Sequence, residues 1–378
     1  EISLGLVGSE MCIRDRCEIV AMESTGSYWK PLYNIMESYD LHAIVVNPAH
    51  MKAVPGRKTD VKDAEWIAEL LQHGLLQPSY IPSKDQRELR ELVQYRKSLV
   101  GERTRELNRL QKMLEGANIK LSGTVTNING KSARKILEYI LSGNEIDEKK
   151  YDEMYEEKLI AHNLKASKEQ ILDDLKGFMS PLQRRMLKEL LQHLDELNVH
   201  IENLNDEIDN FMKPEEKQAS QVIQDVTGIG NTSAQTIIAV IGTDMERFPS
   251  DRHISSWAGL CPGDNVSAKK RKSGKIRKGN ALLKSTLVLC AHAAVRHKSS
   301  YFHAQFKRIS THRGKKRAYV AVAHSILIAI YHILKDGVKY QDLGAEYYNQ
   351  FNAERKIHAY LKKLKALGWE PPKEAVPA

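Results

Sequence analysis

The chain has 378 residues, 42% of them hydrophobic and 28% charged, and a formal net charge of +9 at pH 7. This apolar content excludes a fully disordered protein and is enough for two or three domain cores. The positive charge favours a polyanionic partner, and no apolar run is long enough to span a bilayer. The four cysteines are isolated and show no zinc-site spacing with histidines, which favours a reducing, cytoplasmic location.

The first apolar run, residues 19–22, predicts a strand that stops at Glu23. Residues 28–39 have helical spacing, and a second strand is expected over residues 43–46. Strand, helix and strand in this order favour parallel pairing, in which functional side chains lie at the carboxyl ends of the strands. Glu23 is therefore a candidate active-site carboxylate, and an exposed loop glutamate is the alternative.

The strongest local signal is a pair of aspartates at a predicted helix start. A basic segment with Arg57 and Lys58 leads into a helix expected to run to residue 73, with Asp60 at the N-cap and Asp63 on the same face one turn later. N-capping explains Asp60, but it explains neither Asp63 nor the neighbouring cations. Two carboxylates beside cations indicate a site for Mg²⁺ and phosphate.

Residues 84–116 predict a long helix with a basic polar face. Its cations are candidates for phosphate contacts, but interleaved glutamates make a solvated, salt-bridged face the preferred interpretation. These cations are Arg90, Arg96, Lys97, Arg103, Arg105, Arg109 and Lys112.

A loop over residues 124–131 and two or three polar helices follow. Apolar residues then alternate steps of three and four, which predicts a coiled-coil seam of roughly four heptads. The seam comprises Leu187, Leu190, Leu194, Leu197, Ile201, Leu204, Ile208 and Phe211. It pairs either with the 84–116 helix of the same chain or with a second protomer, and we favour dimerisation.

After Pro214, the sequence Gly228-Ile229-Gly230 leads into an apolar helix over residues 233–241. This pattern is typical of a helix-hairpin-helix turn, whose backbone N–H groups bind phosphate without sequence preference. A tight turn without a ligand is the alternative, because Gly-x-Gly before a helix is a weak motif.

A dense basic loop is expected over residues 269–280, with almost no compensating acid. We expect this loop to contact nucleic-acid phosphates. Its cations are Lys269, Lys270, Arg271, Lys272, Lys275, Arg277 and Lys278. A second basic cluster over residues 307–317 precedes an apolar helix over residues 319–334, and the tail from residue 350 is charged.

Three motifs together resemble the DEDD insertion-sequence transposases of the one-ten family: Glu-Ser-Thr-Gly at 23–26, Asn-Pro at 47–48 and Thr-Asp-Val-Lys-Asp-Ala at 59–64. The segment from Gly228 through Ala-Gly-Leu-Cys-Pro at 258–262 to Lys-Gly-Asn at 278–280 resembles the second domain of the same family.

The resemblance implies a RuvC-like (RNase H-like) nuclease domain that binds Mg²⁺ or Mn²⁺ through four acids. Glu23, Asp60 and Asp63 match three of them, and the first aspartate has no counterpart. It also implies a serine nucleophile in the C-terminal domain, at Ser267 by register, with Ser273 as the competing position.

Residues 6–15 look like one reading frame of a sequencing adapter. We therefore expect residues 1–16 to be an artefact, Asp15 not to be a metal ligand, and the nuclease domain to be N-terminally truncated and inactive in this form. A genuine strand over residues 2–7 that supplies the missing aspartate is the alternative.

The expected fold class is α/β plus mainly α. A partial RuvC-like domain spans residues 17–83, a helical coiled-coil region 84–213, and a helical C-terminal transposase domain with the glycine turn 214–345. A charged tail over 346–378 follows.

The resemblance implies site-specific DNA recombination by metal-assisted phosphoryl transfer through a serine-linked intermediate, in the bacterial cytoplasm near the nucleoid. Expected partners are DNA, a structured guide RNA and further protomers. Two alternatives remain: a RuvC-like junction-resolving endonuclease that uses water, and a non-catalytic nucleic-acid-binding protein. Whether the site forms within one chain or between protomers is open.

Overall fold

The computed structural model describes residues 18–47, 60–144, 146–161, 166–262, 265–267, 270–273, 276, 278–350 and 353–369. Within these, the side chains of 60–63, 265–267, 270–273, 348–349 and 353–356 are not described. The chain divides into two compact units, Glu1–Lys84 and Asp85–Ala378. Each unit is considered by itself.

The first unit contains the predicted strand, helix and strand, followed by a second helix. Its elements are β1 (Ile19–Glu23), α2 (Trp29–Ser38), β2 (His42–Val46) and α4 (Asp60–Gln72). The two strands are parallel, with Ile19 opposite His42 and Glu23 opposite Val46. Parallel strands need a crossover connection, which α2 provides. Helix α2 packs against β2 and helix α4 against β1.

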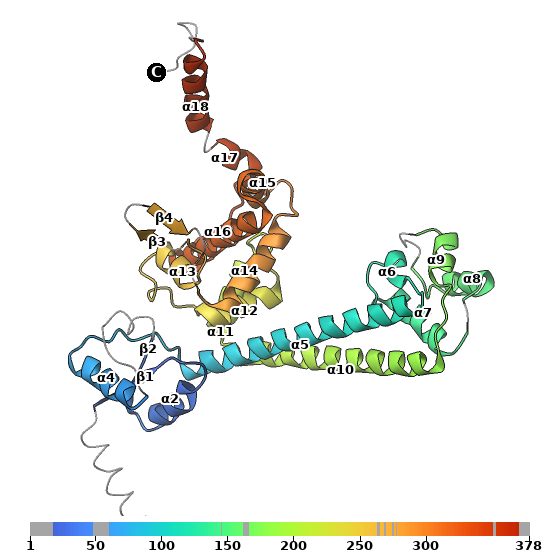
Figure 1. Cartoon of the computed structure of the whole chain (residues 1–378), viewed down its shortest axis with the longest axis horizontal. Helices are drawn as coiled ribbons and strands as arrows, with labels where there is room; N and C mark the ends of the chain where they lie inside the picture. Colours follow the sequence, from blue (N-terminus) through green and yellow to red (C-terminus); the bar gives the residue numbers. More distant parts are fainter. Residues whose placement is uncertain are drawn as a thin grey trace, which may run out of the picture. The chain divides into compact units, whose positions relative to one another are not determined.

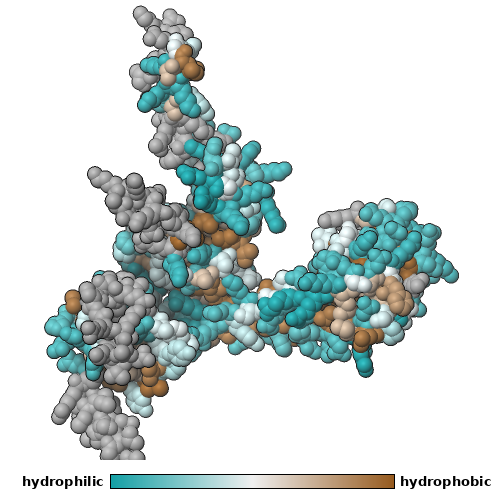
Figure 2. Space-filling model, viewed as in Figure 1, coloured by the Kyte–Doolittle hydropathy of each residue, from teal (hydrophilic) through white to brown (hydrophobic). Residues whose placement is uncertain are grey.

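The second unit begins with two long helices, α5 (Lys84–Gly116) and α10 (Pro181–Phe211), which lie side by side (Figure 1). Arg96 Nη1 donates to Asn205 Oδ1 at 3.0 Å, and Arg103 Nη1 donates to Asn198 Oδ1 at 3.2 Å. The partner's number falls on α10 as the number rises on α5, so the helices are antiparallel. Their visible face is mostly hydrophilic (Figure 2), as expected when both apolar stripes face each other.

The leucine seam of α10 is covered by α5 of the same chain. Leu99 of α5 packs with Leu197, Ile201 and Leu204 in one buried cluster. Our preference for dimerisation through this seam was wrong, because the buried stripe faces a helix that the chain itself supplies. The seam also shifts at its N-terminal end, where Leu191 is buried.

Four short helices form a small core with the far ends of α5 and α10 (Figure 1). They are α6 (Leu121–Thr124), α7 (Lys131–Leu141), α8 (Glu148–Glu156) and α9 (Lys168–Asp174). Leu114 of α5, Ile136 of α7 and Leu187 of α10 share this core. Helix α10 starts with a capping box, in which the Ser180 hydroxyl accepts from Gln183 N and the Gln183 side chain accepts from Ser180 N.

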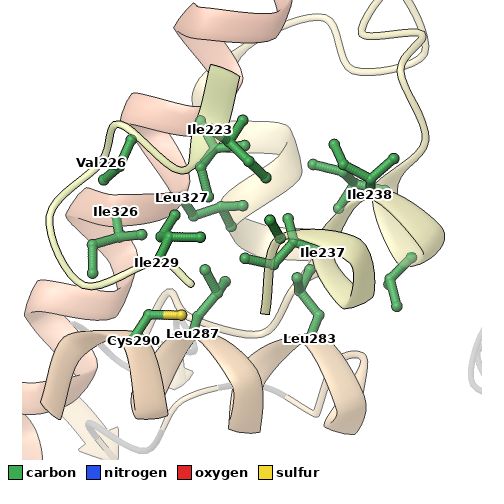
Figure 3. Close-up of a cluster of buried hydrophobic side chains, with 14 of the residues drawn as sticks. Ile223, Val226, Ile229, Ile237, Ile238, Leu283, Leu287, Cys290, Ile326 and Leu327 are labelled. Carbon is green, nitrogen blue, oxygen red and sulfur yellow. The ribbon is translucent and has the colours of Figure 1, made fainter. Parts of the chain in front are cut away.

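The main core lies among the C-terminal helices, where Ile229, Leu283, Leu287 and Leu327 approach one another (Figure 3). The helices of this part are α11 (Pro214–Ile223), α12 (Asn231–Ile241), α13 (Asp251–Trp257), α14 (Ala281–Ala294), α15 (Tyr301–Arg313), α16 (Lys315–Asp336), α17 (Gly344–Gln350) and α18 (Ala353–Ala366). A short ribbon of β3 (Asn265–Ser267) and β4 (Lys270–Ser273) connects α13 to α14.

Helix α16 is long and apolar enough to cross a membrane by length and composition alone. Its residues Val322, Ile326 and Leu327 are, however, completely buried in the main core. A core helix of a globular domain accounts for its composition.

Candidate catalytic residues and nucleic-acid interface

Glu23 is the last residue of β1 and is partly exposed. The strand pairing continues one residue further, since Ser24 N donates to Val46 O at 2.9 Å. The Thr25 hydroxyl donates to the Glu23 carboxylate. Glu23 is therefore fixed to the carboxyl end of a parallel strand, which is the edge where open α/β sheets place functional groups.

Asp60 and Asp63 belong to the first turn of α4, the helix that packs against β1. Their side chains, and the whole of Arg57 and Lys58, lie outside the described residues. Among the side chains that are described, no group of three or more His, Cys, Asp or Glu is placed to hold a metal ion. A carboxylate at the end of β1 and two at the start of a helix packed on β1 fit the oxygen ligands that Mg²⁺ prefers.

The Gly-Ile-Gly segment forms the turn of a helix pair, α11 and α12, as the sequence predicted. Gly228 has φ +95°, and a Cβ there would lie 2.5 Å from Cys290 O and 2.6 Å from Ala294 N. Close packing on α14 therefore requires this glycine. Gly230 precedes the first residue of α12, has φ −102° and has open space where a Cβ would be. Of the two glycines in this motif, Gly230 is therefore the one with open space beside it.

Arg96 of α5 has a structural role next to this turn, because it contacts the first residues of α12. Its side chain is 2% exposed, and its Nη1 donates to Asn205 Oδ1 and, at 2.6 Å, to Gln235 Oε1. Its Nη2 donates to Thr232 O at 3.0 Å. Burial lowers the pKa of Arg96 to about 10. Arg96 is thus neither solvated nor able to reach phosphate, and it ties α5 and α10 to α12.

The basic segment is a two-stranded ribbon where a loop was predicted. In the antiparallel register Ser267 lies opposite Lys270, and Asn265 lies opposite Ser273. Pro262 pairs with Ile276 beyond the open end of the ribbon. Ser267 is therefore at the turn end of the ribbon and Ser273 at its base.

The predicted cations of this segment divide into three groups. Lys270, Arg271 and Lys272 are on β4. Lys278 is exposed. Lys269, Lys275 and Arg277 lie outside the described residues.

The base of the ribbon is fixed to the core of the domain. A Cβ on Gly279 would lie 2.4 Å from Ala258 C and from Gly259 N, so this glycine permits backbone to pack on backbone. Asn280 Oδ1 then accepts from Leu283 N at 2.9 Å and caps α14. Neither role was predicted from the sequence, although asparagine immediately before an apolar helix is a recognisable capping signal.

Two family models match the chain. A DEDD transposase model of the IS110 group, described as a transposase, matches residues 6–119. A model described as the transposase IS116/IS110/IS902 family matches residues 220–307. The first match contains Glu23, Asp60 and Asp63, and the second contains the glycine turn and the ribbon.

Curated relatives agree with these matches. The chain is 24% identical over 312 residues to the transposase for insertion sequence element IS1111A of Coxiella burnetii, which covers 81% of this chain and 74% of the relative. It is 27% identical over 135 residues to the insertion element IS110 uncharacterized 43.6 kDa protein of Streptomyces coelicolor, which covers 34% and 31% of the two chains. The chain therefore belongs to the IS110 family of DEDD transposases.

Proposed function

We propose that this transposase catalyses site-specific DNA recombination, with Ser267 as the nucleophile and Glu23, Asp60 and Asp63 as the ligands of Mg²⁺ or Mn²⁺. The observation that carries the proposal is the ribbon. It holds Ser267 at the turn end of a hairpin whose other strand consists of Lys270, Arg271, Lys272 and Ser273. This arrangement brings a hydroxyl and a group of cations to one element, as attack on a phosphodiester requires.

In the proposed step, the Ser267 Oγ attacks phosphorus, an Oγ–P bond forms, and the P–O bond to one DNA end breaks. The released DNA oxygen takes up a proton and becomes a hydroxyl, which balances the proton lost from the Ser267 hydroxyl. The phosphoserine link conserves the phosphodiester for later attack by another DNA end. Lys270, opposite Ser267 in the register, is the cation we assign to the phosphate charge. A divalent metal, when bound, supplies charge compensation at the phosphate and makes the attacking hydroxyl more acidic.

The two units of the fold have different proposed roles. We propose that the first unit is part of a RuvC-like domain and that α5 and α10 form a coiled-coil arm. The C-terminal part presents the serine, and Gly230 contributes a phosphate contact at the start of α12. We further propose that a structured RNA guides the choice of DNA, that the active form is a dimer or tetramer, and that the protein acts at the nucleoid in the bacterial cytoplasm.

The test is a covalent-adduct assay with Mg²⁺, element-end DNA and the RNA encoded by the element. We expect Ser267→Ala to abolish the protein–DNA adduct and Ser273→Ala to retain it. Asp63→Asn should abolish both adduct and cleavage.

Cleavage without adduct in the wild type and in both serine variants would contradict the serine mechanism. It would leave the junction-resolving endonuclease, in which water attacks. Unchanged cleavage in Asp63→Asn would contradict the metal site.

A further inference from the structure

A second cationic feature lies away from the ribbon cations. One face of α5 and the first residues of α14 line an open pocket of about 670 Å³. From α5 come residues at helical spacing, among them Arg90, Lys97, Gly101 and Arg105. Asn280, the capping residue of α14, also lines the pocket.

The charge of this pocket is positive. Three cations and one acid, Glu102, are among its described lining residues. Arg90 Nε donates to Ala239 O at 3.0 Å, and Arg90 Nη2 donates to Val240 O, so the guanidinium is held in place. Lys97 donates to the Ser285 hydroxyl. Arg105 lies 3.7 Å from Glu102.

The start of α14 adds to the positive charge around this pocket. The N–H groups of a first helical turn lack partners within the helix, and the macrodipole places partial positive charge there. Asn280 satisfies the N–H of Leu283. The preceding residues Ala281 and Leu282 line the pocket.

Gly101 is a second unusual feature of the pocket. It lies in the interior of a 33-residue helix, where glycine is a poor choice. A Cβ there would meet only Arg105 Nη1, at an ordinary 3.6 Å. Neither packing nor backbone conformation requires a glycine here. Glycine does allow a ligand to approach the backbone of α5 closely.

We propose that this pocket binds a phosphate of a nucleic-acid backbone without reading sequence, an inference that rests on the proposed function. Cations and a helix N-terminus are the groups that hold phosphodiesters in place. Asn280 directly follows Lys278 and Gly279 at the base of the ribbon. A nucleic-acid strand bound in the pocket would thus lie next to the base of the β3–β4 ribbon, which carries Ser267.

The first test fills the pocket without changing its charge. Fluorescence anisotropy is measured with the full chain and a labelled mixed-sequence DNA duplex, and separately with an RNA hairpin. Gly101→Leu should weaken binding several-fold, and Gly101→Ala, which adds a single methyl group, should weaken it less. Both replacements improve helix propensity, so neither should lower the melting temperature.

The second test removes one charge. Lys97→Gln should reduce the slope of log Kd against log salt concentration by about one for the duplex. Lys112→Gln, an exposed position on the same helix outside the pocket, should leave the slope unchanged.

Weaker binding of either probe by Gly101→Leu supports the pocket, and the probe affected identifies DNA or RNA as the source of the phosphate. Wild-type affinity in both Gly101→Leu and Lys97→Gln overturns the pocket and leaves the proposed function standing. No binding of either probe by the wild type overturns both proposals.

Discussion

At the residue scale, backbone space decides which glycines of the C-terminal domain can change. Gly228 and Gly230 are two residues apart in one motif, yet only Gly228 faces a neighbouring helix at contact distance. The motif therefore combines a packing position with an open one. Their substitutions separate the two roles.

We predict that Gly228→Ala lowers the free energy of unfolding by about 1–3 kcal/mol. The new methyl group overlaps the backbone of α14, and φ is in the left-handed region. Gly230→Ala, the matched control, should change the free energy of unfolding by less than about 0.5 kcal/mol. Urea denaturation measures both. Equal losses in the two variants would contradict the assignment of Gly228 as the packing glycine.

A half-buried histidine, His324, gives a second prediction at this scale. Burial lowers the pKa of His324, and Asp251 offsets part of this effect. The unfolded chain binds a proton at a pH of about 6.5, while the folded chain keeps the imidazole neutral to lower pH. The free energy of unfolding is therefore at its full value above about pH 6.5. It decreases as the pH falls through the lowered pKa that His324 has in the folded state.

Urea denaturation at about pH 7.5 and pH 5.5 should show this loss in the wild type and a smaller loss in His324→Gln. His312→Gln, at an exposed position on α15, should keep the wild-type pH dependence. The same pH dependence in His324→Gln and in the wild type would exclude His324 as its source.

At the element scale, the chain joins separate cores through α5 and α10. Leu89 and Ile208 belong to the main core, Leu99 and Ile201 to the middle of the helix pair, and Leu114 to the distal core. One apolar stripe on each helix thus contributes to three clusters. Loss of packing in the middle should therefore weaken the link between the other two.

We predict that Ile201→Ala lowers the free energy of unfolding by about 2–5 kcal/mol, because it leaves a cavity between α5 and α10. Val199→Ala, on the same helix but 53% exposed, should change it by less than about 0.5 kcal/mol. The loss should not depend on protein concentration, since the stripe is covered within one chain. A concentration-dependent loss would indicate that a second protomer covers it.

At the scale of the whole molecule, the two units differ in size and in the cores they contain. The described sheet of the first unit has two strands, whereas the second unit contains the three helical clusters. A two-stranded sheet contributes little independent stability. The second unit should therefore carry most of the cooperative unfolding.

We predict that the fragment Asp85–Ala378 unfolds in a cooperative thermal transition close to the main transition of the full chain. Far-UV circular dichroism of the fragment and the full chain measures this. A fragment without a cooperative transition would show that the first unit is required for the fold of the second.

Local order could be predicted from the sequence because each element depends on neighbouring residues. The alternation of strand and helix around Glu23, the 84–116 helix with its stated bounds, and the apolar stripe of α10 follow from periodicity alone. The family could also be predicted, because its motifs are short contiguous segments. Of the proposed site, the sequence yields the residue types and their order along the chain.

Tertiary structure decided everything that depends on distant residues meeting. The partner of the α10 stripe is α5, which no periodicity specifies. Arg96 has the same local pattern as its exposed neighbours and is buried only because α10 and α12 pack around it. Gly228 and Gly279 are needed because backbone from α14 and from the end of α13 lies against them. A sequence pattern reports which side chains are apolar or charged, and only packing fixes which surfaces touch.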